Sequence, residues 1–109
     1  MDIQLKRGLL EVLVLATLME GESYGYALVK ALSACVDISE STLYPILRRL
    51  EAAAMLTVTS REYNGRLRKY YAITDAGRAR VGAFVEEQRE MMKIFRYIEE
   101  RKGAAHDES

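Results

Sequence analysis

The dipeptide Asn64-Gly65 is the feature that most constrains how this chain can fold. It lies between two predicted strands, residues 56–62 and 67–73. Asn-Gly is the preferred pair for a two-residue turn between antiparallel strands, because both turn positions need a positive φ. The sequence therefore predicts a β-hairpin with this pair at its tip.

A two-residue turn also fixes which strand residues face each other. It pairs Leu56 with Ile73 on the face that we expect to pack on the core, and it leaves Lys69 on that face near the tip. The opposite face carries three arginines and two tyrosines: Arg61, Tyr63, Arg66, Arg68 and Tyr70. Arg61 lies directly opposite Arg68 in this register, and like charges in that position destabilise a hairpin. We therefore expect this face to need an anionic partner.

Three helices are predicted before the hairpin from their apolar periodicity. They cover residues 3–19, 24–34 and 39–54. The first has two apolar stripes, so one of them must be covered by another element or by a second subunit. Ser23 is the expected N-cap of the second helix, and either Ser39 or Ser41 that of the third. The third helix thus begins with short polar side chains.

A last long helix is predicted over residues 75–102, with Thr74 as its N-cap. Apolar side chains repeat along it at spacings of three and four, which is typical of a coiled-coil seam. Nothing later in the chain can cover this seam, so we expect a second copy to do so. The predicted dimer contacts are Leu10, Val14, Phe84, Gln88, Met91, Met92, Phe95 and Ile98.

The order of these elements predicts a mainly α fold with one β-hairpin, a winged helix-turn-helix followed by a long C-terminal dimerisation helix. We divide the chain into a DNA-binding domain over residues 1–74, a dimerisation helix over 75–102 and a disordered tail over 103–109. In such folds the recognition helix, here the third helix, contacts base edges with its N-terminal residues. The wing, here the hairpin, contacts the DNA backbone with its basic residues.

The formal net charge is zero, with 16 basic and 16 acidic residues, but the charges are unevenly distributed. Residues 40–80 hold eight basic and four acidic side chains. The flanks are acidic, with three against five in residues 1–39 and five against seven in residues 81–109. A basic middle between acidic flanks is expected of a confined phosphate-binding surface.

Several classes of protein are disfavoured by the sequence. The single cysteine, Cys35, allows no intramolecular disulfide and no metal cluster, and no cofactor is expected. No nucleophile, base and oxyanion arrangement can be assembled, which argues against an enzyme. The longest apolar stretch, residues 8–19, is too short to span a bilayer, and no signal peptide is evident. We therefore expect a cytoplasmic protein with no membrane partner.

Three motifs carry a resemblance to a known family. They are Tyr24-Gly25-Tyr26, the segment STLYPILRRLE over residues 41–51, and the segment GRLRKYYAITDAG over residues 65–77. In this order and at these separations, they resemble the PadR-like transcriptional regulators, specifically the small members with a single C-terminal helix. The chain departs from that pattern at Ala54, where the family usually has glycine, and it has no tryptophan on which flat aromatic drugs could stack.

The resemblance implies a homodimer in which the last helix packs with the first helix of the partner. It also implies repression at a palindromic operator in double-stranded DNA, with release by a small aromatic or drug-like effector or by a stress signal. The candidate DNA contacts are Ser39, Ser41, Thr42, Tyr44, Arg48, Arg61, Arg66, Arg68 and Lys69.

Two other functions fit the same fold. The zero net charge would suit a protein-interaction module without DNA binding. The methionines and phenylalanines of the last helix would suit a module that senses small molecules.

Overall fold

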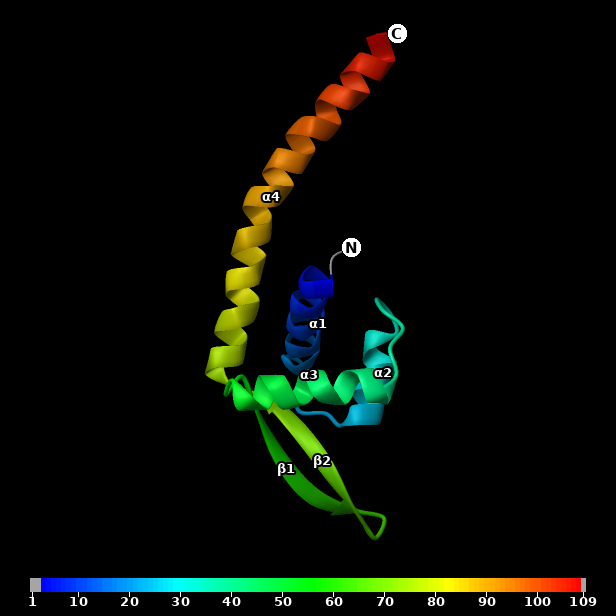
Figure 1. Cartoon of the computed structure of the whole chain (residues 1–109), viewed down its shortest axis with the longest axis vertical. Coiled ribbons are helices and arrows are strands. Elements are labelled where there is room, and N and C mark those ends of the chain that lie inside the picture. Colours follow the sequence, from blue (N-terminus) through cyan, green and yellow to red (C-terminus); the bar gives the residue numbers. More distant parts are fainter. Residues whose placement is uncertain (1–2, 109) are drawn as a thin grey trace.

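The computed structural model describes residues 3–108, and the side chains of residues 7–103. The elements are α1 (Ile3–Leu18), α2 (Gly25–Leu32), α3 (Glu40–Ala52), β1 (Leu56–Tyr63), β2 (Arg66–Ile73) and α4 (Asp75–Glu108). In Figure 1 the first three helices form a bundle, the hairpin projects below α3, and α4 rises past α1 and extends well beyond it. The predicted winged helix-turn-helix with a long last helix is confirmed. No described helix combines the length and apolarity needed to cross a bilayer.

The core lies between α1, α2, α3 and the base of the hairpin. Its fully buried side chains include Leu15, Leu28 and Leu43, one from each helix of the bundle. Val14 is also fully buried in this core, so the prediction that it contacts a second subunit is wrong. Both apolar stripes of α1 looked alike in sequence, and the packing of α2 and α3 decided which one faces inward.

The hairpin has the predicted register. Leu56 pairs with Ile73, Arg61 with Arg68, and Tyr63 with Arg66. The turn residues Asn64 and Gly65 have φ of 51° and 77°, the positive values that a two-residue hairpin turn of this type requires. Each strand extends one residue further toward the tip than predicted, because the turn itself occupies only two positions.

The expected N-caps are partly corrected. Ser39, and not Ser41, caps α3, since its side chain accepts a hydrogen bond from the backbone N–H of Thr42 at 3.3 Å. Ser23 does not cap α2, whose N-cap residue is Tyr24 and makes no side-chain cap. Instead the Ser23 backbone forms a β-bridge with Tyr71, with N···O distances of 3.0 and 2.7 Å. A serine hydroxyl before a helix predicts a cap only when the backbone is free to turn there.

The end of α3 shows why glycine suits position 54, where this chain has alanine. The N–H of Met55 bonds to the carbonyl of Leu50, and that of Ala54 to the carbonyl of Glu51, both at 2.9 Å. This is the Schellman pattern, which requires a left-handed residue after the helix. Ala54 occupies that position with a φ of 59°. An alanine is strained there, whereas a glycine would not be.

We therefore expect Ala54→Gly to raise the free energy of unfolding. Relief of the left-handed strain should exceed the entropy that glycine adds to the unfolded chain, for a net gain of about 0.5–1 kcal/mol. Urea denaturation measures the change. The matched control is Ala53→Gly at the preceding residue, whose φ is −86°, and it should lower stability. Equal losses in both variants would contradict the strain at residue 54.

α4 is joined to the end of α3 by Thr74. The Thr74 hydroxyl accepts from the N–H of Gly77 at 3.2 Å, which is the predicted N-cap, and donates to the carbonyl of Ala54 at 2.7 Å. Only the first turns of α4 pack on the domain, through Val81. The helix continues to Glu108 and not to Lys102, which corrects the expected disordered tail over residues 103–108. Gly103 alone costs a helix only about 1 kcal/mol, which is not enough to end it. Ser109 lies outside the described residues.

Candidate nucleic-acid interface

The N-terminus of α3 presents a cluster of three exposed hydroxyls. The Ser39 Oγ lies 2.8 Å from the Ser41 Oγ and 3.2 Å from the Thr42 Oγ1. All three side chains are open to solvent next to the unpaired N–H groups of the first helical turn. Hydroxyls and free N–H groups in such a position can donate to phosphate oxygens or meet base edges.

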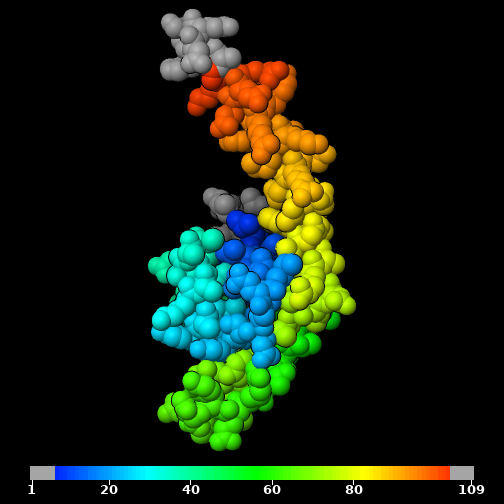
Figure 2. Space-filling view, turned by 180° about the vertical axis from the view of Figure 1, so that it is seen from behind, coloured from blue at the N-terminus to red at the C-terminus, as the bar shows by residue number. Residues whose placement is uncertain are grey.

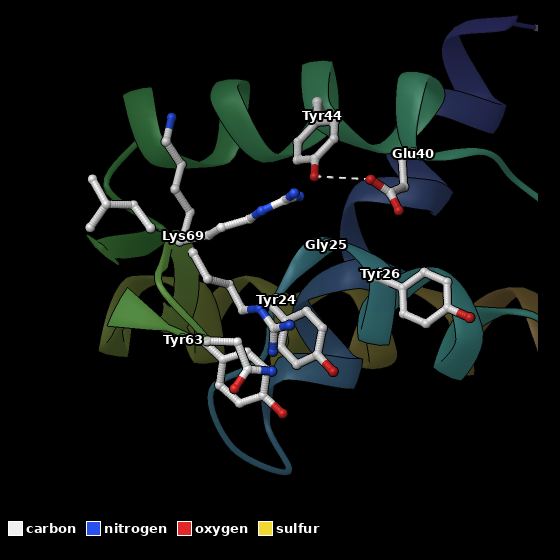
Figure 3. Close-up of a pocket in the computed structure, with 11 residues that line it drawn as sticks. Tyr24, Gly25, Tyr26, Glu40, Tyr44, Tyr63 and Lys69 are labelled. Carbon is white, nitrogen blue, oxygen red and sulfur yellow. Dashed lines mark hydrogen bonds between the residues drawn. The ribbon is translucent and has the colours of Figure 1, made fainter. Parts of the chain in front are cut away.

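Tyr44, one turn further along α3, is held by its own chain. Its hydroxyl donates to the Glu40 carboxylate at 3.1 Å, as Figure 3 shows. Partial burial raises the pKa of Tyr44, and the hydrogen bond to Glu40 raises it further. The ring lies against Gly25, where an added Cβ would be 2.6 Å from the tyrosine oxygen. The glycine of the Tyr-Gly-Tyr motif thus makes room for this side chain, and the hydroxyl predicted to contact DNA is committed to Glu40.

An open recess of about 750 Å³ lies between α3, the start of α2 and the hairpin. Four tyrosines line it, together with Glu40 of α3 and Arg66, Arg68 and Lys69 of β2. In Figure 3, Lys69 projects from the hairpin below α3, while Tyr24 and Tyr63 lie together on the far side of the recess. The structure thus brings the wing cations to a recess beside the first turns of α3, where Glu40 and Tyr44 line it.

Arg61 and Arg68 already have partners within the chain. Arg61 forms an ion pair with Glu22, and its guanidinium lies 3.8 Å from the centre of the Tyr70 ring. Arg68 lies between two tyrosine rings, Tyr24 and Tyr63, at 3.9 Å from each centre. The chain itself therefore provides a carboxylate and aromatic faces for Arg61 and Arg68, so these two arginines need no outside anion, and the expectation of an anionic partner stays a prediction for Arg66.

Arg66 and Lys69 differ from those two arginines. Both are exposed, and neither makes an ion pair or an aromatic stack within the described part of the chain. Lys69, on the core side of the hairpin near its tip, faces α3 across the recess. It also borders a smaller recess of about 140 Å³ that Arg48 of α3 lines. Two cations from different elements therefore converge beside the hairpin.

The other basic residue of this helix turn, Arg49, is not available. Its Nε donates to the Glu11 carboxylate of α1 at 3.0 Å. Arg48 is exposed beside the hairpin and near Tyr71. The pKa of Tyr71 is raised by burial and by the Glu51 carboxylate, and Arg48 offsets part of this rise. Of the two adjacent arginines, only Arg48 faces the wing.

Sequence reasoning missed Glu22, Tyr24 and Glu40 as partners of the site residues. No local pattern shows that the loop between α1 and α2 lies against the hairpin, so Glu22 and Tyr24 could not be identified as partners of Arg61 and Arg68. The spacing of Glu40 and Tyr44, four residues apart on a helix, is a signal that could have revealed their hydrogen bond.

The fold and this surface can be compared with known proteins. The family model described as "Transcriptional regulator PadR-like family" matches residues 14–83, which is more than half of the chain. The chain belongs to the PadR-like family. The matched residues run from the core of α1 to the first turns of α4 and include α3 and the whole hairpin.

Solved structures agree with this assignment. A PadR family transcriptional regulator from Eggerthella lenta is 43% identical, with a TM-score of 0.68, and the match covers 83% of this chain and 80% of that one. A PadR-like transcription factor from Bacteroides fragilis is 29% identical, with a TM-score of 0.79 and coverage of 87% and 94%. PadR of Bacillus subtilis, solved in complex with operator DNA, shares the fold at 22% identity and a TM-score of 0.67, covering 71% of this chain and 46% of that one.

Proposed function

We propose that this PadR-like regulator is a repressor that binds a palindromic operator as a homodimer. The observation that carries the proposal is the convergence of Arg48 of α3 and the unpartnered wing cations Arg66 and Lys69 on two recesses that share Tyr44 and Lys69, beside the N-terminal turns of α3. The structural likeness to Bacillus subtilis PadR, which was solved with operator DNA, supports the same use of the fold.

The proposed contacts divide by chemistry. Ser39, Ser41 and Thr42 stand at the end of α3 that enters the major groove in this fold, where hydroxyls can meet base edges or phosphate. Arg48, Arg66 and Lys69 are cations without a described partner and suit the phosphate backbone, which positions the protein without reading sequence.

The homodimer is proposed from the exposed seam of α4. Beyond its first turns α4 leaves the domain, and Figure 2 shows its orange half standing alone in this view. Met91, Phe95 and Ile98 have exposed fractions of 59, 53 and 59%. Soluble proteins rarely leave such a contiguous apolar strip open to water. A second copy related by a twofold axis would cover it and would make the operator palindromic.

Helix α1 is the proposed second part of that interface. Leu9 is 40% exposed, and Leu10 packs against the core of its own domain but keeps part of its surface open to solvent. Phe84, Gln88 and Met92 border an open groove of about 530 Å³ on α4. A partner helix would turn that groove into an enclosed apolar site, and we propose that a small aromatic effector binds there and releases the DNA.

The wing contacts predict a specific change in DNA binding. Replacing Arg66 and Lys69 with alanine should weaken binding to all sequences, because phosphate contacts are not sequence-specific. The slope of log affinity against log salt should fall by about 0.9 for each lost contact. Fluorescence anisotropy at several salt concentrations measures both. Arg101→Ala, at the far end of α4, is the matched control and should change neither. An unchanged slope in the double variant would remove the wing from the interface.

The proposed function itself is tested by recovering bound DNA from the native genome. Enrichment of a palindrome, with half-sites about one helical turn apart, is the expected result. Recovery of no enriched DNA would instead favour a protein-interaction module on the same fold.

A further inference from the structure

The hairpin carries four cations, and two of them are built into the fold. We infer that Arg68 and Arg61 are positioning residues, which hold the wing at its angle to α3, and are not phosphate contacts. This inference rests on the proposed function, since the wing is positioned for DNA. The sequence presents the three arginines of this hairpin face as equivalent, whereas the inference assigns Arg61 and Arg68 to positioning and leaves Arg66 for phosphate.

The first observation is a continuous stack of side chains, which we call the arginine–tyrosine ladder: Tyr63, Arg68, Tyr24, Tyr70 and Arg61. Arg68 lies 3.9 Å from the ring centres on both of its sides. Tyr24 then meets Tyr70 edge to face, with ring centres 5.8 Å apart and planes at 72°. Arg61 closes the ladder over Tyr70 at 3.8 Å. Such contacts are cation–π and aromatic pairs, each favourable when geometry is fixed.

The second observation is that the ladder joins two separate parts of the chain. Tyr24 comes from the loop before α2, whereas the other four members come from the hairpin. The same loop contributes the backbone bridge between Ser23 and Tyr71 and the ion pair between Glu22 and Arg61. It therefore acts as a short third strand on a two-stranded ribbon, which would be only marginally stable alone.

The backbone bridge anchors only the base of the hairpin. Tyr71 lies near the end of β2, while Tyr63 and Arg68 lie toward the tip. The ladder is the contact that extends the anchoring from the base toward the tip, where Arg66 is presented. If the ladder is broken, the tip should move relative to α3, and the free cations Arg66 and Lys69 should lose their fixed positions.

Charge-preserving substitutions distinguish positioning from phosphate contact. A lysine can replace an arginine as a point charge at a phosphate, but it lacks the planar guanidinium that stacks between two rings. We expect Arg66→Lys to bind operator DNA within about twofold of the wild type. Arg68→Lys should lose about three- to tenfold, as much as Arg68→Met. Wild-type affinity in Arg68→Lys, with a lower salt slope only in Arg68→Met, would overturn the inference.

A second measurement needs no DNA. Amide hydrogen exchange of the free protein reports local opening of the hairpin. Arg68→Lys and Tyr24→Leu should each speed exchange of the β1 and β2 amides by about three- to tenfold, and the double variant should add little more. Tyr24→Phe keeps the ring and should exchange like the wild type.

The two measurements separate the possible failures. Unchanged hairpin exchange in both Arg68→Lys and Tyr24→Leu would overturn the ladder even if the protein binds DNA well. If the wild-type protein binds no DNA but both variants exchange faster than it does, the proposed function is overturned and the anchoring of the wing still stands.

Discussion

Replacing Phe95 and Ile98 with glutamate should convert the proposed homodimer into a monomer. The two side chains are 53 and 59% exposed in the single chain, so burying the remaining half of each against a partner contributes about 0.8–1.5 kcal/mol. A twofold interface contains each side chain twice, so the double variant loses about 3–6 kcal/mol, or about two to four powers of ten in the dissociation constant. Burying four carboxylates would add to this loss. Sedimentation equilibrium measures the change directly.

The matched control is Tyr97→Glu. Tyr97 is 57% exposed, but two residues from Phe95 on an α-helix place it on the far side from the seam. This variant should remain dimeric. The monomer should also lose high-affinity operator binding, since each chain then holds only one half-site. A double variant that is folded and still dimeric would show that another surface makes the dimer.

Among glycine-to-alanine substitutions in this chain, Gly77→Ala should lower the free energy of unfolding the most. A Cβ at Gly77 would lie 2.3 Å from the carbonyl oxygen of Met55 and 2.6 Å from the Ile73 Cγ1. The backbone oxygen cannot move aside easily, because it accepts a hydrogen bond from the N–H of Thr74 at 3.1 Å. The start of α4 would have to separate from the hairpin base. We expect the free energy of unfolding to fall by about 2–3 kcal/mol.

Gly82→Ala, one turn and a half further along α4, is the control for helix propensity. A Cβ there meets nothing within 4 Å, so alanine should raise stability by about 0.5–1 kcal/mol. Urea denaturation of both variants at the same protein concentration compares them, since the stability of a dimer depends on concentration. A stabilising effect at both glycines would contradict the close contact between α4 and Met55.

The local elements of this protein were predictable because their causes are local. Asn64-Gly65 can adopt the positive φ values of a two-residue turn, and a turn of fixed length sets the register of the strands beside it. Thr74 caps α4 because the first free N–H groups of a helix lie within reach of the residue before it. The family resemblance rested on the same short segments, and the family model spans them.

Partners between distant segments could not be predicted in the same way. Val14 lies in the core because α2 and α3 pack on that stripe of α1, whereas the sequence presents two similar stripes. Ser23 forms a β-bridge because the hairpin passes beside its backbone. A sequence pattern describes the structure that one segment can form. The burial of Val14 and the bridge at Ser23 depend instead on which distant segment packs beside each residue.

The hairpin shows which facts about its arginines come from the sequence and which come from the tertiary structure. The sequence alone determined that Arg61, Arg66 and Arg68 share one face, because side chains alternate strictly along paired strands. Only the tertiary structure decided that Arg61 and Arg68 are partnered by Glu22 and the tyrosines while Arg66 stays exposed. The physical reason is distance along the chain: Glu22 is 39 residues from Arg61, and only the packing of the loop before α2 brings their charges together.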